Sequence, residues 1–89
     1  MADTNAGENA KKIGVITHYY GKIGVAAVKL EDSLKVGDRV RFVGNTTDFE
    51  DVIKSIQIEH GPVDEAGFGD EVGIRVRDKV RDGDRLYLI

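Results

Sequence analysis

The sequence predicts an all-β fold, and within that class a small, closed, six-stranded barrel. Short runs rich in Val, Ile and Tyr alternate with clusters of Gly, Asp and Asn, which is the composition of strands joined by tight turns. No long stretch carries the periodicity of a helix. These two observations indicate a sandwich or a barrel. A closed barrel is favoured because it removes the exposed edges of an open sheet.

Six strands are expected, at residues 12–19, 23–30, 39–43, 49–59, 71–76 and 85–89. In the third, Val40 and Phe42 alternate with Arg39 and Arg41, so one face is apolar and the other charged. The fourth is long, and two adjacent apolar residues near its middle predict a bulge. Residues 62–67 begin with the only proline and end with a glycine, a pattern that predicts a single helical turn.

The chain divides into a polar tail and one domain. Residues 1–11 offer too little apolar surface to offset the entropy of ordering, so we expect a flexible N-terminal tail. Residues 12–89 are enough for a single domain. The tail lacks the apolar centre of a signal peptide, and no segment approaches the length of a membrane span. We therefore expect a soluble, cytoplasmic protein without a membrane partner.

A weak internal repeat marks three strand entrances. Gly37-Asp38, Gly69-Asp70 and Gly83-Asp84 each precede a charged residue and then an alternating apolar strand. Glycine permits a positive φ in a tight turn, and the aspartate carboxylate can accept a hydrogen bond from nearby backbone. We interpret the three aspartates as turn residues rather than catalytic ones.

Composition excludes several functions. Sixteen acidic and thirteen basic residues give a net charge of -3, which argues against general charge-driven binding to nucleic acid. Without cysteine, and with two histidines, neither a thiolate nor a His-only zinc site is possible. The acidic clusters lack the calcium-loop pattern, and neither a phosphate loop nor a nucleophile elbow is present. We expect no catalysis, metal, cofactor or nucleotide.

Three segments in series, residues 34–40, 56–66 and 69–74, resemble the second, barrel domain of elongation factor Tu. Their order and spacing match over residues 12–89. The resemblance extends to related barrels in initiation factor two and at the C-terminus of collagenase-like peptidases. It implies a Greek-key barrel of the translation-protein type, without the GTPase machinery of the neighbouring domain.

In translation factors one end of this barrel holds the aminoacylated end of tRNA. The resemblance places the pocket positions at Gln57 and Glu71, with His60 close by as a residue able to stack on a base. This chain departs from the family at both pocket positions. An amide stands at the first, where elongation factor Tu has an acid, and a carboxylate at the second, where it has an amide.

Five basic residues have outward parity on the third and fifth predicted strands: Arg39, Arg41, Arg75, Arg77 and Lys79. If those strands are neighbours, the five form a stripe able to follow phosphates, with Tyr19 and Tyr20 as stacking surfaces. The first hypothesis is therefore a non-catalytic module that binds RNA, either tRNA or the ribosome. The alternative is a protein–protein adaptor that docks on a separately encoded domain or enzyme.

Overall fold

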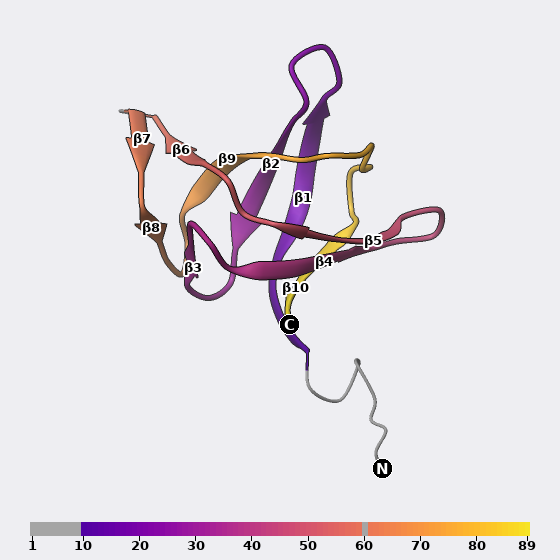
Figure 1. Cartoon of the computed structure of the whole chain (residues 1–89), viewed down its shortest axis with the longest axis horizontal. Coiled ribbons are helices and arrows are strands. Elements are labelled where there is room, and N and C mark those ends of the chain that lie inside the picture. The colour runs from indigo at the N-terminus through magenta and orange to yellow at the C-terminus, as the bar shows by residue number, and fades with distance from the viewer. Residues whose placement is uncertain (1–9, 60) are drawn as a thin grey trace.

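A computed structural model describes residues 10–59 and 61–89, and within them every regular element is a strand (Figure 1). The prediction of an all-β fold is therefore confirmed. The strands are β1 (Lys11–Tyr20), β2 (Val25–Leu30), β3 (Leu34–Lys35), β4 (Arg39–Val43), β5 (Asp48–Val52), β6 (Ile56–Ile58), β7 (Gly61–Val63), β8 (Glu65–Ala66), β9 (Glu71–Arg75) and β10 (Arg85–Leu88).

Eight strands form one antiparallel sheet in the order β5-β4-β10-β1-β2-β9-β6-β7, and β3 pairs with β8 in a second, two-stranded sheet. The order has two ends, β5 and β7, so the prediction of a closed six-stranded barrel is wrong. Both edges carry residues that discourage further pairing. Strand β5 is rich in carboxylates, and β7 contains Pro62, which has no N–H to donate.

The predicted strand at residues 49–59 breaks in two, and this break explains the open order. Val52 is exposed whereas the adjacent Ile53 is 1% exposed. The backbone of Ile53 accepts a hydrogen bond from Gly37 N–H at 2.8 Å and donates one to the carbonyl of Asp38 at 2.9 Å. The chain leaves the ladder there, so β5 pairs with β4 whereas β6 pairs with β9 and β7.

The prediction of a helical turn at residues 62–67 is also wrong, because this segment forms β7 and β8. Pro62 lies opposite Gln57, and Ala66 lies opposite Leu34. In this extended form Val63 packs against the core and Ala66 is buried. Burial of Val63 and Ala66 therefore outweighs the local preference of a Pro-to-Gly segment.

The predicted tail, residues 1–11, lies outside the described residues except for Ala10 and Lys11. Lys11 begins β1 and pairs with Leu88. Its ammonium group also lies 2.6 Å from the carboxylate of Asp32. Lys11, which the sequence pattern assigns to the tail, is therefore part of the first strand.

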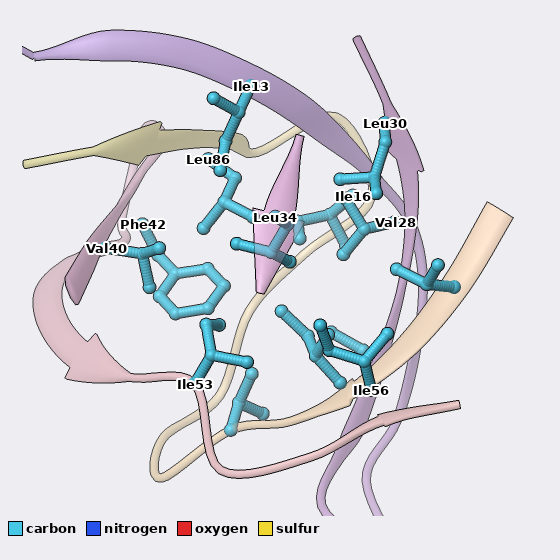
Figure 2. Close-up of a cluster of buried hydrophobic side chains, with 14 of the residues drawn as sticks. Ile13, Ile16, Val28, Leu30, Leu34, Val40, Phe42, Ile53, Ile56 and Leu86 are labelled. Atoms are coloured by element: carbon cyan, nitrogen blue, oxygen red, sulfur yellow. The ribbon is translucent and has the colours of Figure 1, made fainter. Parts of the chain in front are cut away.

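The core lies on one face of the curved sheet, where side chains from most strands point toward one another (Figure 2). Val40 and Phe42 are fully buried, whereas Arg39 is exposed and Arg41 half-buried. The alternation predicted for this strand is thus confirmed. Burying a large apolar side chain is worth roughly 1.5–3 kcal/mol, so this cluster provides most of the stabilisation available to a chain without disulfides.

The three Gly-Asp turns share one geometry. Gly37, Gly69 and Gly83 have φ values of 98°, 87° and 88°, which the third position of a type II turn requires. The carboxylate of each following aspartate accepts a hydrogen bond from the backbone N–H three residues earlier, at 3.0, 2.9 and 2.9 Å for Asp38, Asp70 and Asp84. The interpretation of these aspartates as turn residues is confirmed.

Candidate docking site at the edge of strand β5

The sheet order separates the two strands that were expected to carry a basic stripe. Between β4, which carries Arg39 and Arg41, and β9, which ends at Arg75, lie β10, β1 and β2. The predicted stripe on neighbouring strands is therefore wrong. Arg39 and Arg77 nevertheless meet in one open pocket, because the segment after β9 approaches strand β5.

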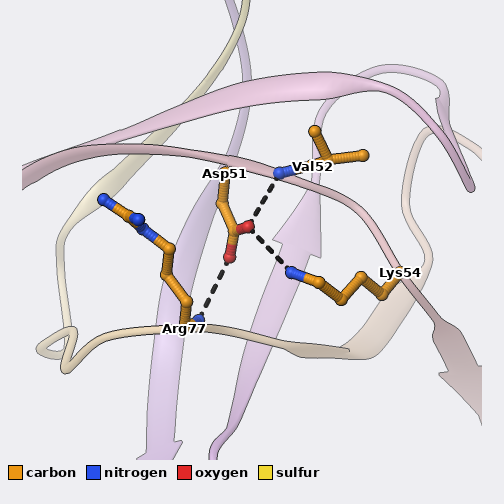
Figure 3. Close-up of polar contacts among 4 residues, drawn as sticks. All are labelled: Asp51, Val52, Lys54 and Arg77. Carbon is orange, nitrogen blue, oxygen red and sulfur yellow. Dashed lines mark hydrogen bonds and ion pairs between the residues drawn. The ribbon is translucent and has the colours of Figure 1, made fainter.

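Asp51 makes this approach possible (Figure 3). One carboxylate oxygen accepts hydrogen bonds from Val52 N–H at 2.8 Å and from Lys54 Nζ at 3.1 Å. The other accepts from the backbone N–H of Arg77 at 3.1 Å. The Asp51 side chain is only 5% exposed. A single carboxylate thus links the β5 edge to the segment after β9, where no strand ladder forms.

The pocket beside this link has a volume of about 310 Å³ and is lined by Arg39, Glu50, Asp51, Val52 and Arg77. Arg39 Nη2 lies 3.5 Å from a Glu50 carboxylate oxygen, a long contact between exposed groups that contributes little. The Arg77 guanidinium carbon lies 5.7 Å from the centre of the Phe49 ring, within the range of a cation–π contact. Two arginines therefore line one hollow.

Arg41, by contrast, is already engaged. Its Nε and Nη2 donate to the two carboxylate oxygens of Asp48 at 2.8 and 3.1 Å. These hydrogen bonds are the main cause of the lowered pKa of Asp48 and the raised pKa of Arg41. A bidentate pair of this kind leaves little of the Arg41 guanidinium for another ligand.

The remaining basic candidates lie outside the pocket lining. Arg75 is exposed on β9 opposite Val25. Lys79 is exposed, and its backbone N–H donates to the Asp78 carboxylate at 2.8 Å. Of the two predicted stacking residues, Tyr19 packs against the core, and Tyr20 is half exposed beside the ring of His18.

Two of the three barrel-end candidates, Gln57 and Glu71, lie on the exposed face of two neighbouring strands. Gln57 on β6 is opposite Gly73 on β9, and Glu71 lies two residues before Gly73. Glu71 accepts a long hydrogen bond, 3.3 Å, from the hydroxyl of Thr17. His60 lies outside the described residues. The structure thus brings Gln57 and Glu71 near each other on a sheet surface, and their role in binding stays a prediction.

The sequence pattern does not identify Glu50, Asp51 and Val52 as members of the pocket. The one available signal was the adjacent apolar pair Val52 and Ile53, which marks the point where the strand breaks. Within residues 10–59 and 61–89, no group of three His, Asp or Glu side chains is placed to hold a metal ion. In the same part of the chain, no helix is long and apolar enough to cross a membrane.

The chain is similar in sequence to proteins named protease and collagenase. No family model matches the chain. It is 42% identical over 79 residues to an uncharacterized protease of Methanocaldococcus jannaschii, a match that covers 88% of the chain and 19% of that protein. It is 32% identical over 77 residues to a collagenase of Porphyromonas gingivalis, covering 84% of the chain and 21% of the collagenase. The chain therefore spans about a fifth of the length of these relatives.

Solved structures similar to this chain include two forms of the C-terminal domain of a putative U32 peptidase from Geobacillus thermoleovorans. One superposes with a TM-score of 0.84 at 24% identity, covering 89% of this chain and 92% of that domain. The other, a selenomethionine variant, gives 0.80 at 25% identity and covers 85% and 96%. This chain has the fold of that C-terminal domain.

These relatives correct the functional reading of the sequence. The similar proteins are named protease, collagenase and peptidase. They bear out the part of the resemblance that pointed to the C-terminal domain of collagenase-like peptidases. The assignment to translation proteins, with an elongation-factor-like role and RNA binding, is contradicted by the same relatives.

Proposed function

We propose that this chain is a non-catalytic protein-docking module of the kind found at the C-terminus of U32 peptidases. The observation that carries the proposal is the extent of the similarity. The chain matches about a fifth of each curated relative and almost the whole of a separate C-terminal domain. The matched part is a compact domain, and the rest of each relative is much larger. A small domain of this kind fits a role in attaching or positioning an enzyme better than a role in catalysis.

The carboxylates support a structural rather than a catalytic role. A general acid or base needs a carboxyl group that is free to exchange a proton with substrate. The buried Asp51 and Asp84 side chains instead accept hydrogen bonds from backbone N–H groups. Asp38 and Asp70 do the same in their turns. These groups hold loops in place.

The arginine pocket supplies a contact for a partner. In this proposal Arg39 and Arg77, which both line the pocket, bind a carboxylate of an acidic protein segment, since guanidinium groups bind carboxylates through paired, charge-assisted hydrogen bonds. Asp51 does not compete, because its charge is compensated by Lys54 and two backbone N–H groups. Val52, which is 43% exposed, adds an apolar contact beside the charges.

The partner is a peptidase domain, either on the same polypeptide or encoded separately. Docking through an exposed charged pocket depends on complementary charge and gives specificity and fast association more than high affinity. Such a contact fits a module that positions an enzyme without altering its reaction.

The pocket is tested by titrating the isotope-labelled chain with a tetraglutamate peptide while following backbone amide resonances. We expect the largest shifts at Val52 and Arg77. Charge reversal by Arg39→Glu or Arg77→Glu should abolish them, because the reversed side chain repels the ligand. Lys22→Glu, at an exposed turn between β1 and β2, is the matched control and should keep them.

Two results would contradict the assignment of this pocket. Shifts that survive both arginine reversals would place the binding elsewhere. A uridine oligonucleotide that shifts the same amides while tetraglutamate does not would exclude a carboxylate site.

A further inference from the structure

The hairpin of β1 and β2 projects beyond the strands on either side of it (Figure 1). Its ladder with β10 ends at Val15, and its ladder with β9 ends at Val25. Residues 20–24 form the hairpin tip, where two large apolar side chains are exposed, Tyr20 at 50% and Ile23 at 61%. Exposed side chains of this size forgo the apolar burial that drives folding. Because the tip is convex, it suits insertion into a hollow on another molecule.

The hairpin tip is held in one shape by its backbone. The carbonyl of Tyr20 accepts hydrogen bonds from Ile23 N–H at 3.2 Å and from Gly24 N–H at 2.9 Å. Gly24 has a φ of 67°, which glycine adopts at little cost, and its carbonyl accepts from Val76 N–H at 3.0 Å. The Tyr20 ring meets that of His18 edge to face, with centres 4.3 Å apart. A preorganised tip loses little entropy on binding.

Strand register places Tyr20 in one row with a positive charge. Val25 lies directly opposite both Tyr20 on β1 and Arg75 on β9, and residues directly opposite one another present their side chains on the same face. The three therefore share the outer face of the sheet. Lys22 is exposed at the tip. Within the described part of the chain, neither Lys22 nor Arg75 forms an ion pair.

Carboxylates lie away from this row in the strand ladders that the structure describes. The next row contains none, since it consists of His18, Ala27, Gly73 and Gln57. One row further, Glu71 lies directly opposite Lys29 and accepts a hydrogen bond from the Thr17 hydroxyl at 3.3 Å. On the segment after β9, the Asp78 carboxylate accepts from Lys79 N–H at 2.8 Å. The surface around the tip is thus positive, although the whole chain has a net charge of -3.

The hairpin tip adjoins the arginine pocket through a single residue. Val76, whose N–H donates to Gly24 at the tip, lies between Arg75 in the tip row and Arg77 in the pocket lining. Two residues of chain span at most about 7 Å. A partner bound at the pocket therefore lies close to the tip as well.

We infer that the hairpin tip inserts into an apolar hollow on the docked protein, with aspartate or glutamate side chains of that protein facing Lys22 and Arg75. Tyr20 and Ile23 are the apolar contacts. The inference rests on the proposed docking function and adds a second contact with the same partner. Interfaces take much of their binding energy from tyrosine and arginine in such places.

The charges favour an acidic protein over an anionic membrane as the occupant. Lipid-binding clusters commonly carry about four to eight basic residues, whereas the row and tip supply Lys22 and Arg75. The net charge of -3 also repels an anionic surface as a whole. A protein hollow lined by a few carboxylates matches a small, convex, positive tip better.

Photocrosslinking in the protein's own cells tests this contact. Benzoylphenylalanine replaces Ile23 in one version of the chain and Phe68 in the matched control. Phe68 is also exposed, at 83%, but lies in the turn bonded to Leu30 at the opposite end of β2. We expect position 23 to crosslink to one protein, within a peptide that contains aspartate or glutamate, and Arg77→Glu to deplete the product strongly. Equal crosslinking from position 68, a product retained with Arg77→Glu, or a crosslink to nucleic acid would overturn the inference.

Affinity for the crosslinked protein, once purified, measures each contribution. Tyr20→Ala should weaken binding about tenfold and Ile23→Ser about threefold, while Tyr20→Phe stays near the unchanged chain. Arg75→Glu and Lys22→Glu should also weaken it by repulsion, although Lys22→Glu keeps the tetraglutamate shifts because Lys22 does not line the pocket. Ile23→Ser should leave the melting temperature unchanged, since Ile23 is exposed. Full affinity in both Ile23→Ser and Arg75→Glu would refute the contact.

The tip contact and the docking function fail in different ways. If the chain captures a protein through its arginine pocket but position 23 gives no crosslink above position 68, the tip contact is refuted and the docking function stands. If the unchanged chain captures no protein and tetraglutamate shifts no amide, both are refuted. Sedimentation with phosphatidylserine vesicles that Ile23→Ser abolishes would refute a protein as the occupant of the tip.

Discussion

The turns at residues 67–70 and 81–84 use the same chemistry for opposite purposes. In each, a glycine with positive φ precedes an aspartate that bonds back to the turn. Asp84 is 5% exposed and is bonded through its backbone to Ile16 in β1, whereas the other turn presents Phe68 to solvent. A local motif therefore fixes the shape of a turn, and its neighbours decide whether it stabilises the fold or displays a side chain.

The largest loss of stability is expected at Gly44, whose backbone lies against the buried Asp84 carboxylate. A Cβ at Gly44 would lie 1.9 Å from Asp84 Oδ1, and the buried carboxylate has little room to move. Gly44→Ala should therefore lower the free energy of unfolding by about 3 kcal/mol, as overpacking does. Urea denaturation measures it. A loss no greater than that of Gly67→Ala, where a Cβ would meet nothing within 4 Å, would show that the Asp84 side chain moves aside easily.

Removing the aspartate carboxylate should lower the free energy of unfolding by different amounts in the two turns. Asp84→Ala leaves the backbone N–H of Arg81 without its acceptor in a part-buried place, so we expect a loss of about 2 kcal/mol. Asp70→Ala exposes Gly67 N–H to water, which replaces the lost partner, and should cost roughly half as much. Equal losses in urea denaturation would contradict the division into a buried and an exposed turn.

Replacing the glycine should cost the same stability in both turns, unlike replacing the aspartate. Gly69 and Gly83 have nearly the same positive φ, and a Cβ at either position meets nothing within 4 Å. Only backbone strain remains, so Gly69→Ala and Gly83→Ala should each cost about 1 kcal/mol. Melting curves of the two variants test this. A much larger loss in Gly83→Ala would mean that the buried turn adds a steric term.

The smallest effect concerns a carboxylate held by a side chain instead of a turn. The pKa of Asp48 is lowered mainly by its hydrogen bonds with Arg41. Because the folded pKa lies below the unfolded value, the pair stabilises the fold above the ordinary carboxyl pKa and loses this effect as pH falls through the folded value. Asp48→Asn should lower the urea midpoint slightly near neutral pH and less at about pH 2.5. A difference in urea midpoint between Asp48→Asn and the unchanged chain that grows as pH falls would contradict this sign.

Sequence patterns predicted what depends on neighbours along the chain. The alternation of Val40 and Phe42 with Arg39 and Arg41 indicates a strand with one buried face. Gly-Asp indicates a turn in which the aspartate accepts from a backbone N–H three residues earlier. Both are local, so tertiary structure had little opportunity to change them. The resemblance to peptidase C-terminal domains rested on two of these turns, at Gly37-Asp38 and Gly69-Asp70, and on residues 56–66 between them.

Patterns could not predict which strands lie side by side. The basic stripe required β4 and β9 to be neighbours, and no periodicity encodes strand order. The arginine pocket depends on the bond between Asp51 and Arg77, which are 26 residues apart. The open sheet depends on Ile53, whose turn into the core splits a run that reads as one strand. Each of these features depends on tertiary contacts, which the local sequence indicates only weakly.

The account is tested most directly by affinity purification of the tagged chain from its own cells, with and without nuclease, beside its Arg77→Glu variant. A docking module predicts a protein partner that survives nuclease and is lost or strongly depleted with Arg77→Glu. Material that disappears with nuclease, or a partner retained equally by the variant, would contradict the claim that this domain docks a protein through its arginine pocket.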